Sequence, residues 1–135
     1  MTTLIHAQRR NYDCGVAALA GFLGVAYEDA YVAAIAASAT FRSRQGLSIP
    51  DMIAMARGFG RTLTRTHYKR VDLEEHVGIL GVNWDRSVWR KHGSQGHWVI
   101  LRAGTIIDPS GPCYSDAADY LITNKGRAGT LLREA

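Results

Sequence analysis

The spacing of hydrophobic residues changes character near residue 60, and this change constrains the fold of the chain more than any other feature. Before it, apolar runs of helical length alternate with polar turns. Helices are therefore predicted over residues 14–23, 27–38 and 50–57. Asp13 is a candidate N-cap of the first helix, and Gly24 is a stop signal. Ser48 and Asp51 have the spacing of a capping box at the start of the third.

After residue 60 the pattern is typical of short strands separated by turns. Strands are predicted over residues 62–68, 77–83, 97–102, 105–108 and 130–132, helical turns over 71–76 and 116–121, and a long polar loop over 84–96. Ala103 and Gly104 predict a two-residue turn, with a three-residue loop and a glycine bulge as the alternative. Helices followed by antiparallel strands indicate an α+β fold, with N-terminal helices packed on a C-terminal antiparallel sheet.

Length and composition place the chain among ordinary globular proteins. Its 135 residues predict a single domain over residues 1–135. The hydrophobic share of 47% and the charged share of 21% exclude a disordered chain. No apolar stretch approaches the roughly 20 residues that span a bilayer, and no signal-peptide core precedes the first helix. Two cysteines make no disulfide framework, so we expect a reducing, cytoplasmic location.

The charge of the chain is positive but scattered. The net charge is +4, and the basic residues occur in pairs rather than in a dense run. Nucleic-acid binding usually needs a denser basic stripe with aromatic residues placed to stack on bases. We therefore expect a mildly basic surface and no nucleic-acid partner, although the charge favours acidic partners.

Cys14 has the sequence context of a nucleophile. It is the first residue of the predicted helix at 14–23, where the positive end of the helix dipole favours a thiolate. Gly15 lets other atoms approach the sulfur closely. The alternative is a buried thiol that acts as a small hydrophobic group, and this is our interpretation of Cys113.

His97 and Asp108 are the candidate partners of that nucleophile. With a two-residue turn, Val99 pairs with Asp108, and His97 becomes its diagonal neighbour on one face of the hairpin. Asp108 then accepts from one ring nitrogen and leaves the other facing the thiol. The alternatives are a hydrogen-bonded core histidine and an aspartate that makes the turn before Pro109.

An oxyanion formed at the sulfur would need hydrogen-bond donors. The backbone N–H of Cys14 offers one, and the side-chain amide of Gln8, six positions upstream, offers a second. Gln8 is followed by Asp13-Cys14-Gly15 and Ala17-Ala18-Leu19, and the segments GHWVIL (96–101) and IIDPSG (106–111) come later. In this order the segments resemble a papain-like cysteine peptidase, closest to the bacteriocin-processing family that cleaves double-glycine leaders, and to its free-standing relatives.

The resemblance implies a papain-like fold and a role for each matching position. Cys14 would be the nucleophile, His97 the general base and acid, Asp108 the orienting residue and Gln8 the oxyanion donor. It also implies a peptide or protein substrate, cleaved after small residues such as Gly-Gly. A silent peptide-binding module, an acyltransferase and a deamidase stay open as alternatives on the same fold.

Other residues give weaker signals. A metal site built from Cys14, His92, His97 and Cys113 has no supporting spacing and would consume the nucleophile, so we expect no metal and no cofactor. The tryptophans at 84, 89 and 98 either line a substrate groove or pack in the core. The loop at 84–96 has the length of a functional lid.

Overall fold

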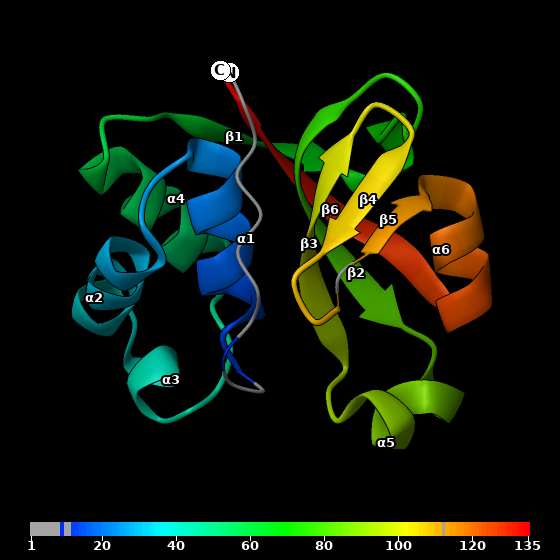
Figure 1. Ribbon diagram of the computed structural model, residues 1–135, viewed down its shortest axis with the longest axis horizontal. Coiled ribbons are helices and arrows are strands. Elements are labelled where there is room, and N and C mark those ends of the chain that lie inside the picture. The colour runs from blue at the N-terminus through cyan, green and yellow to red at the C-terminus, as the bar shows by residue number, and fades with distance from the viewer. Residues whose placement is uncertain (1–8, 10–11, 112) are drawn as a thin grey trace.

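The computed structural model describes residues 9, 12–111 and 113–135. Figure 1 shows a helical half beside a twisted sheet, with one further helix on the opposite face of the sheet. The helices are α1 (Cys14–Leu23), α2 (Tyr27–Ala37), α3 (Ala39–Arg42), α4 (Ile49–Gly58), α5 (Trp89–His92) and α6 (Ala117–Asn124). The strands are β1 (Leu63–His67), β2 (Val77–Trp84), β3 (Gly96–Arg102), β4 (Thr105–Asp108), β5 (Cys113–Asp116) and β6 (Gly126–Glu134). The predicted α+β class is confirmed.

Helix α1 occupies the centre of the helical half. Nine of its ten residues are buried, because small and apolar side chains cover every side of the helix. Figure 1 shows α1 between the sheet and the helices α2 and α4. The first residue, Cys14, is the one that is only partly buried. The helix therefore presents its N-terminal sulfur at the boundary between the two halves of the molecule.

The two predicted N-caps have different outcomes. The capping box of Ser48 and Asp51 is confirmed, with each side chain accepting from the other's backbone N–H. Asp13 occupies the predicted N-cap position of α1, but its side chain makes no capping hydrogen bond. The fully buried Asp13 carboxylate instead accepts from the Tyr27 hydroxyl and from the Arg9 backbone N–H. It thus joins α2 and the segment before Cys14 to the start of α1.

The sheet has the strand order β1-β6-β2-β3-β4-β5 among the described residues, and every pair is antiparallel. The largest difference from the sequence-based expectation is β6, which spans 126–134 rather than 130–132. Its glycines break the alternation of side chains that identifies a strand. At Gly126 a side chain has no room, because a Cβ there would lie 2.7 Å from Val82 and 2.9 Å from the Trp84 ring. At Gly129 a Cβ would lie 2.7 Å from the exposed Asn83 side chain, which would have to move.

The turn at residues 103–104 has the predicted two-residue form. Ala103 and Gly104 both have positive φ, 40° and 92°, which suits the twist of an antiparallel hairpin. Arg102 pairs with Thr105 and Leu101 with Ile106, as the two-residue turn requires. This register carries His97 and Asp108 to one end of the β3–β4 hairpin.

Each face of the sheet covers its own core. One face packs against α1 and α4, with α2 on the far side of α1, and the other face packs against α6. Trp98 belongs to the helical-side core, and its indole N–H donates to the Leu47 carbonyl oxygen at 2.9 Å. This buried bond fastens β3 to the segment before α4. No helix in the described part of the chain has the length and apolar character needed to cross a membrane.

Helix α1 lies against the sheet with no room for a side chain at Gly15. A Cβ there would lie 2.9 Å from Leu47, 3.1 Å from Trp98 and 3.2 Å from Met52. We therefore expect Gly15→Ala to lower the free energy of unfolding by about 1–3 kcal/mol in urea denaturation, although alanine favours helices. Gly58→Ala at the end of α4 is the matched control, since nothing lies within 4 Å of its Cβ. Equal stability of the two variants would contradict this account of the packing.

Candidate active site

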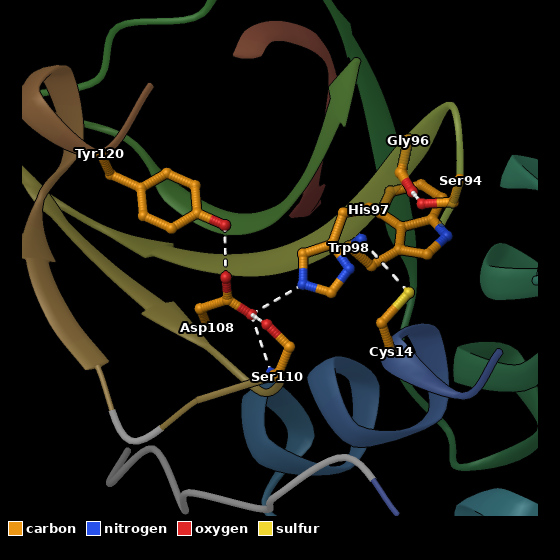
Figure 2. Close-up of polar contacts among 8 residues, drawn as sticks. All are labelled: Cys14, Ser94, Gly96, His97, Trp98, Asp108, Ser110 and Tyr120. Atoms are coloured by element: carbon orange, nitrogen blue, oxygen red, sulfur yellow. Dashed lines mark hydrogen bonds and ion pairs between the residues drawn. The ribbon is translucent and has the colours of Figure 1, made fainter. Parts of the chain in front are cut away.

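Cys14 and His97 come from opposite halves of the molecule and meet at the boundary. The Cys14 sulfur accepts a hydrogen bond from the Trp98 backbone N–H on β3, with the two atoms 3.5 Å apart. His97 Nε2 lies 2.7 Å from Asp108 Oδ1 on β4. Figure 2 shows the imidazole between the Asp108 carboxylate and the Cys14 sulfur, with its second nitrogen on the side of the sulfur. The structure thus brings together three of the four residues predicted for the site.

The fourth predicted residue, Gln8, lies outside the described residues. The nearest described position is Arg9, whose backbone N–H donates to Asp13 at 3.1 Å. Cys113 lies on β5, where its backbone pairs with that of Asp108. Among the described residues, no group of three or more histidine, cysteine or acidic side chains is arranged to hold a metal ion.

The Asp108 carboxylate receives four hydrogen bonds (Figure 2). Its Oδ1 accepts from His97, from the Ser110 backbone N–H at 2.8 Å and from the Ser110 hydroxyl at 2.7 Å. Its Oδ2 accepts from the Tyr120 hydroxyl on α6. Sequence reasoning missed Ser110 and Tyr120. The Asp-Pro-Ser turn is a local signal for Ser110, whereas nothing in the sequence indicates that Tyr120 packs against β4.

These contacts set the protonation states of the pair. Burial would raise the pKa of Asp108, but the hydrogen bond and charge of His97, together with Tyr120 and Ser110, hold this pKa below its usual value. Burial would lower the pKa of His97. The Asp108 carboxylate and the Cys14 sulfur overcome this effect and raise the pKa of His97 to about 10. The pair is therefore an ionised carboxylate beside an imidazole that readily takes a proton.

The imidazole is also held by aromatic stacking. The Trp84 ring, at the end of β2, lies 5.9 Å from the His97 ring with an interplanar angle of 23°. The His92 ring of α5 stacks on Trp84 at 4.1 Å. The segment predicted as a long loop thus contains a short helix, α5, that supports the site. Trp84 and Trp98 each belong to one of the two cores, and each also lines one hollow of the cleft.

The cleft consists of two hollows that meet at Cys14 and His97. One has a volume of about 430 Å³ and extends past Asp108 and Trp84 toward α5. The other has a volume of about 460 Å³ and extends across β2 and β6. Gly46 and Gly96 line both hollows, so side chains are absent from part of the wall where they meet.

The comparison with solved structures agrees with this architecture. The chain is similar to a double-glycine motif protease from an AMS/PCAT transporter, whose crystal structure is a complex with the leader peptide. The likeness covers 97% of this chain and 89% of that one, with a TM-score of 0.63 and 19% sequence identity. The fold is that of the papain-like peptidases. No family model matches the chain, and no curated protein matches its sequence.

The titration of His97 tests the electrostatic coupling in this site. Nitrogen-detected NMR of the imidazole is expected to give a midpoint near 10, rather than the ordinary 6.5, because Asp108 and Cys14 favour the protonated ring. Asp108→Asn removes the carboxylate charge and is expected to lower this midpoint. A midpoint near 6.5 in the unsubstituted protein would contradict the coupling.

The same shifts predict how stability depends on pH. Because folding raises the pKa of His97, its contribution to the free energy of unfolding is complete below pH 6.5 and is lost as pH rises through about 10. Folding lowers the pKa of Asp108, so its contribution is present above pH 3.8 and is lost as pH falls below that value. Urea denaturation of the protein and of Asp108→Asn at pH values of about 3, 5, 7 and 10 is expected to show the largest difference in the free energy of unfolding near pH 5 and a smaller one at both extremes.

Proposed function

We propose that the protein is a cysteine peptidase in which Cys14 is the nucleophile. The observation that carries the proposal is the position of the His97 ring, which is bonded to Asp108 through one nitrogen while its other nitrogen faces the Cys14 sulfur. A nucleophile, a base and a group that orients the base are the three parts that covalent catalysis requires. The protease fold of the structural relative supports the same activity.

Each residue then has a defined step. His97 takes the thiol proton, and the sulfur attacks the carbonyl carbon of the scissile amide. The backbone N–H of Cys14 and the amide of Gln8 donate to the oxyanion that forms. His97 gives its proton to the leaving amine, the C–N bond breaks, and a thioester remains on Cys14. Water, deprotonated by His97, then hydrolyses the thioester and releases the acid product.

Two glycines line the cleft where its two hollows meet. Gly46 and Gly96 belong to the walls of both hollows, as Cys14 and His97 do. The structural relative is described as a double-glycine motif protease. We therefore propose a peptide or protein substrate cleaved after small residues such as Gly-Gly.

The loss of Cys14 should abolish turnover. Cys14→Ala is expected to lower kcat by at least about 10³-fold on a peptide containing a Gly-Gly pair, because no thioester forms. Cys113→Ala is the matched control and is expected to retain activity. Mass spectrometry of a rapidly quenched reaction should find an acyl adduct on Cys14.

The same measurement separates the alternative activities on this fold. Two peptide fragments indicate a peptidase, a product heavier by about one dalton indicates a deamidase, and an adduct on an added amine indicates an acyltransferase. A silent binding module would give none of these products. Cys14→Ala with undiminished turnover would overturn the proposal.

Tyr120 acts in this mechanism as a positioning residue through Asp108. Tyr120→Phe removes one of four hydrogen bonds to the carboxylate, so kcat is expected to fall about tenfold while KM changes little. The midpoint of the His97 titration is expected to rise, because an Asp108 carboxylate with one donor fewer accepts more strongly from the protonated imidazole. A purely structural role for Tyr120 would lower the free energy of unfolding without moving this midpoint.

A further inference from the structure

One half of the cleft leads from the proposed nucleophile to a basic residue at the edge of the sheet. The 460 Å³ hollow begins at Cys14 and His97, crosses β2 and β6, and ends at Arg65 on β1. Its floor lacks side chains at Gly81, where a Cβ would lie 3.2 Å from the Trp98 ring and 3.3 Å from Thr130. The hollow is therefore an open groove across the sheet, with a cation at its far end.

The positive charge continues beyond Arg65. Arg65 also lines a neighbouring hollow of about 580 Å³, together with Lys69, Arg70 and Arg133. No aspartate or glutamate lines either hollow. In the described part of the chain, none of these four cations forms an ion pair. We call these four residues the basic edge.

The acidic residues closest to the basic edge in the sequence are engaged elsewhere. Glu134 pairs with Arg61. The Asp72 carboxylate accepts from the backbone N–H groups of Glu74 and Glu75, at 3.0 and 3.2 Å. In the described structure neither carboxylate forms an ion pair with the basic edge, and the groove connects the charge of that edge to the Cys14 sulfur.

We propose that the basic edge binds acidic side chains of the peptide substrate, at a fixed distance from the scissile bond. This inference rests on the proposed function of Cys14 and adds a specificity to it. From β3 to β1 the groove crosses three inter-strand spacings, roughly 14 Å, which is about four residues of extended peptide. An acidic residue about four positions from the cleaved bond therefore lies beside Arg65.

The binding test uses fluorescein-labelled peptides and the Cys14→Ala variant, which keeps them uncleaved. Each peptide has a Gly-Gly pair and four consecutive glutamates, glutamines or lysines, starting three residues from that pair. The glutamate peptide is expected to bind about five- to tenfold more tightly than the glutamine peptide in fluorescence anisotropy at low salt, and the advantage should shrink as salt is added.

Charge reversal supplies the decisive comparison. Arg65→Glu, added to Cys14→Ala, is expected to remove the preference for glutamate and to create one for the lysine peptide. Arg57→Glu is the matched control, because this exposed arginine of α4 lines neither half of the cleft nor the hollow beside the basic edge, and it should keep the preference. If Arg65→Glu does not fold, Arg65→Gln takes its place. This variant removes the charge without reversing it and should abolish the preference for the glutamate peptide.

The outcomes separate this inference from the proposed function. Cleavage by the unsubstituted protein with equal affinity for the glutamate and glutamine peptides would overturn the inference and leave the peptidase intact. A preference for glutamate that depends on Arg65, without cleavage, would support the inference and overturn the peptidase. A single-stranded DNA of the same charge that binds more tightly than the glutamate peptide would make the basic edge a nucleic-acid site, against the inference.

Discussion

The hydrogen bond between His97 and Asp108 is the interaction on which the candidate site depends. It requires an ionised carboxylate in a place where only 11% of either side chain is exposed, and burial of a charge is costly. The fold meets this cost with further donors to the same carboxylate, two from Ser110 and one from Tyr120. The imidazole can then hold a proton without losing its orientation, because the ring of Trp84, a residue of the core on the α6 side of the sheet, stacks on it.

The sulfur is placed by a different part of the structure. Its position depends on how closely α1 approaches β3, and Gly15 permits this approach by leaving room for Leu47 and the Trp98 ring. Trp98 links the two halves twice, since its indole N–H donates to Leu47 and its backbone N–H donates to Cys14. A change in the packing between α1 and β3 would therefore move the nucleophile relative to the base while leaving the His97–Asp108 pair in place.

The sequence predicted local elements well wherever the residues that determine an element all lie within one short segment. The capping box at Ser48 and the two-residue turn at Ala103-Gly104 are local, and both are confirmed. That turn was sufficient to predict that His97 and Asp108 are neighbours. Asp13 shows the limit of such reasoning, because a partner on α2, the Tyr27 hydroxyl, competes for the carboxylate that the local pattern assigned to a cap.

Contacts between distant segments were not predictable in this way. Tyr120 reaches Asp108 only because α6 packs on the far face of the sheet, and no spacing in the sequence encodes that contact. The extent of β6 was hidden for a related reason, since Gly126 is needed for the close approach of Val82 and the Trp84 ring on another strand. The role of Gln8 stays a prediction.

The place of β6 within the sheet has a consequence for how the protein is made. This strand follows the other five strands of the described sheet in the chain, yet it lies between β1 and β2 and supplies the only strand pairing of β1 in that sheet. Until it leaves the ribosome, β1 has no strand to join and one edge of β2 exposes unpaired backbone groups. A nascent chain thus holds the sulfur and the imidazole on segments that are not yet locked together, and the described sheet is complete only after residues 126–134 have been made.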